Sequence, residues 1–228
     1  MDIKQKTRLF LISLSPIKLI RSIPYDVGNH LANKEDSRSL GNDNYIILYF
    51  NNDFRYSSGF QNDYRNEIDY IKNGDYKKYG SKETFDVKKG LEIEIYFVKA
   101  ITSLYSFFDS KYDVYMKYLV FVDFTYFNSN SICNMRSLFK GCSSLVSIDI
   151  SNFDTTKVNN MRSLFFGCSS LVSIDLSNFD TSEVTDMGFM YCGCSSLVSI
   201  DLSNFNISKV TDMGDMFCSC SSLVSIDL

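Results

Sequence analysis

A column of carboxylates is the most distinctive chemical feature of the sequence. Five Asp residues recur at a spacing of 26 positions through the second half of the chain. If residues 26 apart lie on neighbouring parallel strands, these carboxylates are about 4.8 Å apart. Two such charges repel by about 1 kcal/mol in water and about 3 kcal/mol at an effective dielectric near 20. The members are Asp123, Asp149, Asp175, Asp201 and Asp227.

Three interpretations of this column remain open. It is a solvated strip buffered by Ser hydroxyls, a strip that accepts Ca²⁺, or a strip that binds a basic protein surface. Calcium is the weakest of these, because oxygen ligands in one flat column lack the enclosing loop of a calcium site. We therefore predict no metal site and no cofactor.

The cysteines also follow the repeat, since none precedes Cys133. One column at a spacing of 26 is typical of small buried thiols. A second pair, Cys192 and Cys218, allows either a disulfide between successive units, if the protein is exported, or a zinc site. The members of the first column are Cys142, Cys168, Cys194 and Cys220.

Composition excludes several classes of function. The single histidine, His30, makes histidine-based catalysis improbable, and no other catalytic motif is recognisable, so we predict that the protein is not an enzyme. Residues 1–90 hold 15 Lys and Arg against 12 Asp and Glu, whereas residues 91–228 hold 8 against 15. An acidic repeat array argues against nucleic acid as a partner, because phosphate binding requires Lys and Arg. No stretch approaches the roughly 18 apolar residues of a membrane span.

The columns imply a repeated unit that must position them. Four 26-residue units begin at Leu119, Leu145, Leu171 and Leu197, and the opening six residues recur at Leu223. A fixed period of this length is the mark of a solenoid. Each unit opens with the L-x-x-L-x-L spacing of a leucine-rich repeat, continues through turn residues, and then has apolar residues at helical spacing. We predict a unit of strand, turn, short helix and turn.

Stacked units place equivalent side chains in ladders. We expect the ladders of Leu, Phe and Met to lie inside and the Asn residues near each strand end to bind backbone groups in the turn. The inner ladders are Leu119/Leu145/Leu171/Leu197/Leu223, Phe127/Phe153/Phe179/Phe205 and Met135/Met161/Met187/Met213, and the Asn ladder is Asn152/Asn178/Asn204.

The combined motif resembles a known family. Residues Leu171–Met187, preceded in the repeats by Cys-Ser-Ser, are similar to the BspA-like leucine-rich repeats of microbes and protists, over roughly residues 100–228. The resemblance implies a surface or secreted protein with a role in adhesion and in host or matrix contact. It carries no catalytic residues to transfer.

The sequence before the repeats is less regular. We predict a leader or loosely ordered segment at 1–40, a β-containing cap at 41–90 and the solenoid at 91–228. Strands are predicted at 45–50 and 91–97 and a short helix near 62–72, and a five-residue insertion around 109–116 indicates a surface loop. The chain ends inside a strand, so the solenoid is expected to be incomplete there and open to edge pairing.

These observations predict a right-handed leucine-rich-repeat solenoid, an α/β fold with a parallel strand ladder and short helices. Its expected function is non-catalytic binding of a protein or an extended surface ligand, basic or polymeric, at the cell surface or after secretion. The alternative is a cytoplasmic scaffold for protein–protein interaction. The candidate binding face comprises the five Asp residues of the column and their Ser neighbours: Asp123, Ser147, Asp149, Ser151, Ser173, Asp175, Ser177, Ser199, Asp201, Ser203 and Asp227.

Overall fold

The computed structural model describes residues 44–56, 68–73, 85–90, 92–98 and 100–228. The chain divides into two units, Met1–Gly41 and Asn42–Leu228, and all the described residues belong to the second. Their regular structure is almost entirely β, with a single 3-10 helix and no α-helix. The predicted leader at 1–40 lies outside the described residues.

Antiparallel strands begin the described part of the chain. β1 (Tyr45–Phe50) consists of β-branched and aromatic or leucine side chains, all of them buried, as expected for a central strand. It pairs antiparallel with β5 (Glu92–Phe97) on one side and with β6 (Leu119–Asp123) on the other. The predicted strands at 45–50 and 91–97 are thus confirmed, apart from residue 91, which lies outside the described residues.

β3 (Ile68–Asn73) pairs antiparallel with β5, so the predicted helix near 62–72 is wrong for its described part. Pairing with the exposed edge of β5 satisfies the backbone of this polar segment and overrides its local helix preference. A separate antiparallel pair joins β2 (Phe54–Tyr56) to β4 (Phe85–Val87).

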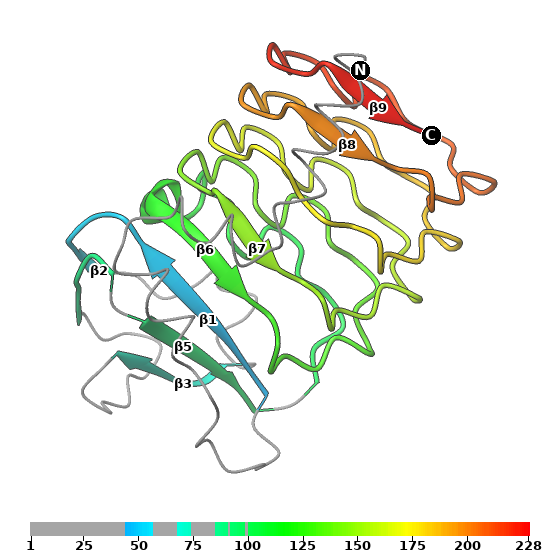
Figure 1. Ribbon diagram of the computed structural model, residues 1–228. Helices are drawn as coiled ribbons and strands as arrows, with labels where there is room; N and C mark the ends of the chain where they lie inside the picture. The colour runs from blue at the N-terminus through cyan, green and yellow to red at the C-terminus, as the bar shows by residue number, and fades with distance from the viewer. Residues whose placement is uncertain (1–43, 57–67, 74–84, 91, 99) are drawn as a thin grey trace, which may run out of the picture. The chain divides into compact units, whose positions relative to one another are not determined.

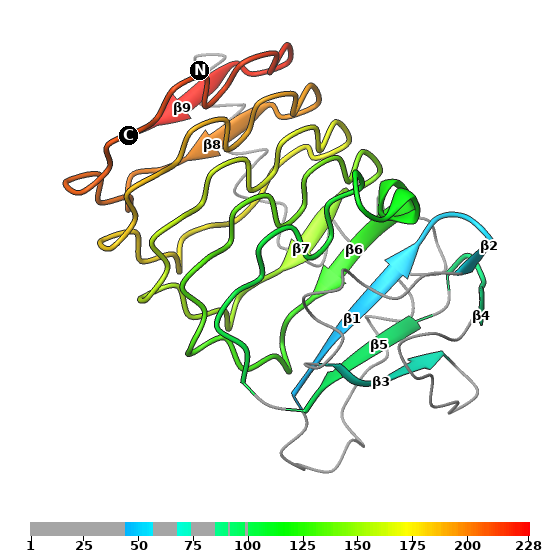
Figure 2. The same ribbon diagram turned by 180° about the vertical axis from the view of Figure 1, so that it is seen from behind.

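The 26-residue units stack in register beyond β6. β6 pairs in parallel with β7 (Ser147–Asp149), and β8 (Ser199–Asp201) pairs in parallel with β9 (Ser225–Asp227). Figures 1 and 2 show the successive coils running from β6 to β9. On a second side of the coils, parallel bridges join Ser103, Asn134, Asn160, Asp186 and Asp212 in sequence.

The predicted parallel ladder is interrupted at its centre. Residues 171–176 are not in a regular strand, so the described sheets end at β7 and begin again at β8. Val172 still accepts a hydrogen bond from the N–H of Val198 at 3.1 Å. The sequence of 171–176 is identical to that of 197–202, and nothing in these side chains explains the interruption.

The predicted short helices are wrong, because the backbone in that part of each unit bonds to the next unit. Here the N–H groups of Met161, Ser163, Phe165 and Gly167 donate to carbonyls of the following unit at 2.8 to 2.9 Å. Ser163 and Gly167 have φ of 56° and 72°, a left-handed conformation that prevents an α-helix from propagating. We call this segment of each unit the donor segment.

The inner ladders are confirmed through the third unit. Leu171, Phe179 and Met187 are at most 3% exposed, as are their equivalents one unit earlier. A stack of rings runs through the core parallel to them, with neighbouring centroids 5.4 to 5.7 Å apart. Its members are Phe108, Phe139, Phe165, Tyr191 and Phe217.

The insertion predicted around 109–116 overlaps the 3-10 helix η2 (Val114–Tyr118). The Asp113 carboxylate accepts from the N–H of Tyr115 and caps its first turn. Tyr112 and Val114 are more than half exposed, as predicted for a surface loop, but Asp109 and Met116 at the two ends of the insertion are buried. No helix among the described residues is long and apolar enough to cross a membrane.

Candidate binding face

The strand side of the stacked units positions the predicted binding residues. β6, β7, β8 and β9 each end in an Asp, and the segment 171–176 has Asp175 at the equivalent position. Asp123 lies opposite Asp149, as Asp201 does opposite Asp227. Figure 1 shows these strands side by side along one flank of the coils. We call the side chains exposed along this flank the strand face.

A local turn fixes the orientation of the Asp side chains. The Oδ1 atoms of Asp175 and Asp201 each accept from a backbone N–H two residues later, at 2.9 Å. Asp149 Oδ1 accepts both the N–H and the hydroxyl of Ser151, at 3.1 and 2.7 Å. These are Asx-turns, which explain why Ser or Thr follows each Asp at this distance. In Asp149, Asp175 and Asp201, these contacts leave Oδ2 for a ligand.

Hydrogen bonding also keeps one member of the column, Asp201, charged. The hydroxyl and then the N–H of Ser203 lower the pKa of Asp201, against a smaller opposing effect of burial. Its carboxylate is therefore ionised at neutral pH. At Asp201, the hydrogen bonds from Ser203 agree with the interpretation of a strip buffered by Ser hydroxyls.

The column is not uniform along its length. Asp175, Asp201 and Asp227 are exposed and Asp149 is partly exposed, whereas Asp123 is only 9% exposed. Asp123 accepts from the N–H of Thr125 at 2.7 Å and lies beside β1. The accessible strip therefore begins at Asp149. Of its predicted Ser neighbours, those at 151, 177 and 203 are exposed, and those at 147, 173 and 199 are partly exposed.

A column of valines was missed in the sequence analysis. Val172, Val198 and Val224 are 43%, 36% and 83% exposed, and Val146 is partly exposed. They occupy the second position of the L-x-x-L-x-L motif, three residues before each Asp. The strand face is thus acidic on one side and apolar on the other.

The exposed Asp residues of the column do not take part in the ion pairs formed within the described residues. None of the pairs formed within the described residues involves Asp149, Asp175, Asp201 or Asp227. The pair Lys209–Glu183 and the Arg162 cluster both lie in other parts of the unit. Within the described residues, no ion pair therefore offsets the negative charge of the strip.

A second acidic ladder, also missed, lies in the donor segments. Arg162 Nη1 is 2.6 Å from Asp212 Oδ2 and 3.4 Å from Asp186 Oδ1, so that one guanidinium spans three units. Gly188 provides the space, because a Cβ there would be 2.6 Å from Arg162 Nη1. Arg162 pairs with both carboxylates and links three successive units, so this ladder has a structural role.

The Asn ladder has the structural role predicted for it at two of its positions. The side-chain amide of Asn204 donates to the carbonyls of Leu176 and Phe179, both at 3.0 Å. Asn178 makes the equivalent bonds to Ile150 and Phe153, at 2.8 and 3.3 Å. These amides satisfy turn carbonyls of the preceding unit.

The thiol column is buried except at Cys220, which is partly exposed. Cys168 and Cys194 donate to the carbonyls of Phe139 and Phe165, at 3.2 and 3.1 Å. Burial raises the pKa of Cys194 to about 12 and that of Cys168 well above its ordinary value. These thiols are therefore protonated at neutral pH and are neither nucleophiles nor metal ligands.

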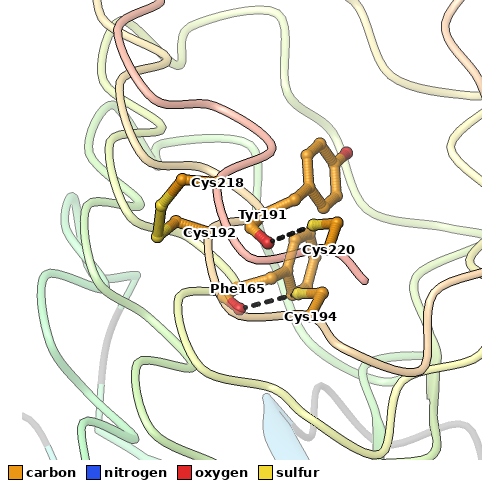
Figure 3. The surroundings of a disulfide bond; sticks show 6 residues. All are labelled: Phe165, Tyr191, Cys192, Cys194, Cys218 and Cys220. Carbon is orange, nitrogen blue, oxygen red and sulfur yellow. Dashed lines mark hydrogen bonds between the residues drawn. A yellow bond between two sulfur atoms is a disulfide. The ribbon is translucent and has the colours of Figure 1, made fainter. Parts of the chain in front are cut away.

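The second cysteine pair forms a disulfide between successive units. Cys192 and Cys218 are bonded, with their Cα atoms 4.5 Å apart, and Figure 3 shows them beside the Cys194 and Cys220 thiols. Of the two alternatives for this pair, the structure contains the disulfide. Within the described residues, no group of three or more His, Cys, Asp and Glu side chains is arranged to hold a metal ion.

The repeated geometry coincides with a family match. Residues 102–226, more than half of the chain, match the family described as "Mycoplasma protein of unknown function, DUF285". The chain belongs to the DUF285 family. No curated protein and no solved structure matches the chain. The DUF285 match begins in the donor segment that precedes η2 and ends inside β9, so it covers the stacked units and excludes the antiparallel strands β1 to β5.

Proposed function

We propose that this DUF285 protein is a non-catalytic interaction protein that binds through the strand face. The observation that carries the proposal is the repetition of one exposed Val-x-x-Asp pattern in successive units, with no ion pair from the described residues to the exposed Asp column. A repeated surface favours a repetitive partner, because several weak contacts act together. The partner is a protein or polymer that presents Lys or Arg beside apolar groups.

We further propose that the stack is a leucine-rich-repeat solenoid of the BspA-like type. The L-x-x-L-x-L ladder, the buried Leu, Phe and Met columns and the 26-residue register support this assignment. The BspA-like resemblance favours adhesion or matrix contact at the cell surface or after secretion. The Cys192–Cys218 disulfide favours the same location, because disulfides persist in oxidising compartments.

Charge reversal on the strand face tests the proposal. We expect Asp175→Lys/Asp201→Lys to weaken binding to a fluorescent oligolysine peptide by at least tenfold. On an array of glycans and matrix proteins, the same double variant should no longer bind the ligands that the parent protein binds. The physical reason is loss of two attractive charges and gain of two repulsive ones. Affinity for the oligolysine peptide should also fall as salt is raised.

A matched control is available in the adjoining turn. Asp154 and Asp180 are also held in Asx-turns, and Asp154→Lys/Asp180→Lys makes the same change in net charge outside the strands. The control should bind like the parent. Equal binding by both double variants would reject the strand face as the contact surface. Thiol alkylation on intact cells separates the exported protein from the cytoplasmic alternative, in which Cys192 and Cys218 would be reduced.

A further inference from the structure

The strand face presents three parallel columns of side chains that share one repeat distance. Where the strands pair, as β8 does with β9, equivalent residues lie directly opposite each other with no shift of register. Neighbouring strands are about 4.8 Å apart, so like side chains recur about every 4.8 Å along the stack and every second one about every 9.6 Å. The Val column is Val146/Val172/Val198/Val224, the Ser column is Ser147/Ser173/Ser199/Ser225, and the accessible Asp column is Asp149/Asp175/Asp201/Asp227.

Each column offers a different interaction to a ligand. The Val column presents apolar surface, since Val172 is 43% exposed. The Asp column presents carboxylates that form no ion pair within the described residues. Between the two, the hydroxyls of Ser173 and Ser199 are partly exposed and form no hydrogen bond in the part of the chain that the structure describes. A matching ligand therefore combines apolar groups, hydrogen-bond acceptors and regularly spaced cations.

The repeat distance distinguishes between the regular conformations of a polypeptide ligand. A polyproline II (PPII) helix has three residues per turn and a rise of about 3.1 Å, so side chains on one side recur about every 9.3 Å, within roughly 0.3 Å of the two-unit distance. An extended strand repeats its side chains about every 6.7 Å on one side. An α-helix returns to the same side after seven residues, or about 10.5 Å. The PPII helix is thus the conformation that stays in step with the columns.

We propose that the strand face binds a proline-rich polypeptide in the PPII conformation, with Lys at every third residue and its axis along the stack. Its Lys side chains meet every second carboxylate, such as those of Asp149 and Asp201, while its prolines cover the Val column. A PPII helix has no internal hydrogen bonds, so its carbonyls can accept from the Ser column. Proline also lacks the N–H that would otherwise need an acceptor. This inference rests on the proposed function and specifies the partner of the same surface.

Two peptides of identical composition test the spacing. The first is a fluorescent fifteen-residue peptide of repeated Pro-Pro-Lys. The second has the same residues in an order that leaves no more than two of its five Lys on any one side of the PPII helix. We expect the full chain to bind the first at least fivefold more tightly, because the two peptides carry the same charge and differ only in where the cations lie.

Two double variants of equal charge test the register on the protein. Asp149→Asn/Asp201→Asn leaves Asp175 and Asp227 two units apart, whereas Asp175→Asn/Asp201→Asn leaves Asp149 and Asp227 three units apart. Asn also forms Asx-turns, so both variants keep the local turn. We expect the second variant to bind the Pro-Pro-Lys peptide at least fivefold more weakly than the first, because only the first retains carboxylates in step with the peptide. The two variants should bind oligolysine alike.

The outcomes separate this inference from the proposed function. Equal affinity of the parent for the two peptides, or equal affinity of the two Asn variants for the Pro-Pro-Lys peptide, would overturn the PPII partner. The strand face would still stand as a contact surface if Asp175→Lys/Asp201→Lys weakens oligolysine binding, and would fall if that variant binds like the parent. Tighter binding of a Thr-Lys repeat peptide with the same number of Lys, which favours an extended strand, would also overturn the inference by assigning the face to a β-strand partner.

Discussion

Tyr191 is the one residue of the ring stack that carries a hydroxyl. It is fully buried between Phe165 and Phe217, and its Oη is the single buried side-chain polar atom without a hydrogen-bond partner among the described residues. Burial also raises its pKa well above the ordinary value. Phe139 and Phe165, at the same position of earlier units, lack this hydroxyl. The unpaired hydroxyl of Tyr191 therefore lowers the stability of the stack.

We predict that Tyr191→Phe raises the free energy of unfolding by about 1 kcal/mol, because it removes a buried polar group that has lost its water. Equilibrium denaturation in urea measures the change. Tyr191→Leu is the matched control, since it also removes the hydroxyl but breaks the ring contacts, and it should destabilise the protein. A loss of stability in Tyr191→Phe would mean that the hydroxyl has a partner.

At the scale of elements, the Cys192–Cys218 disulfide fixes one donor segment to the next. A cross-link that closes a loop of this length contributes about 2–4 kcal/mol, mainly by restricting the unfolded chain. Its later cysteine, Cys218, lies in the donor segment in which Met213 is 41% exposed, whereas Met187 at the same place in the earlier segment is fully buried. The disulfide thus holds the least covered donor segment against its neighbour.

Reduction should therefore act locally. We predict that Cys192→Ser/Cys218→Ser, or treatment with a thiol reductant, speeds hydrogen exchange in residues 197–228 at least tenfold. Exchange in residues 119–170 serves as the internal control and should change much less, because each unit contacts only its neighbours. Equal acceleration in both regions would show that the units unfold as one body, and no change would show that the disulfide is not formed.

Some of these elements were predictable from the sequence and others were not. The strand at Tyr45–Phe50 and the buried Leu, Phe and Met columns follow from alternation and from the 26-residue period. The donor segments do not, because Val184, Met187 and Met190 have helical spacing while the backbone bonds to a neighbouring unit. Positive φ at Ser163 and Phe189 has no signature in residue type. The Ser and Asp of the strand face were predicted, but the exposure of Val172 was not.

At the scale of the whole molecule, the buried ladders couple the units. Met161 is fully buried with units on both sides, whereas Met213 has the same place in its unit and is 41% exposed. The same substitution at these positions therefore separates the effect of burial from that of local sequence. The comparison measures how far a defect spreads along the stack.

We predict that Met161→Asp costs more than about 4 kcal/mol and unfolds several units together, because it places a charge in a ladder shared by neighbours. Met213→Asp should cost about 1 kcal/mol or less. Thermal unfolding followed by circular dichroism distinguishes them. Similar midpoints for the two variants would contradict a continuous core.

The constant register of the stack also bears on how its length can change. Bridges join residues in equivalent places of successive units, so duplication or loss of one whole unit in the coding sequence preserves every column. An insertion or deletion of any other length would shift the apolar residues that follow it out of the core. The exception is a change in a surface loop outside the stacked segments, such as the segment that contains η2. Genes of this kind can therefore grow or shrink in whole-unit steps, which adjusts the reach of the protein while its surface chemistry stays the same.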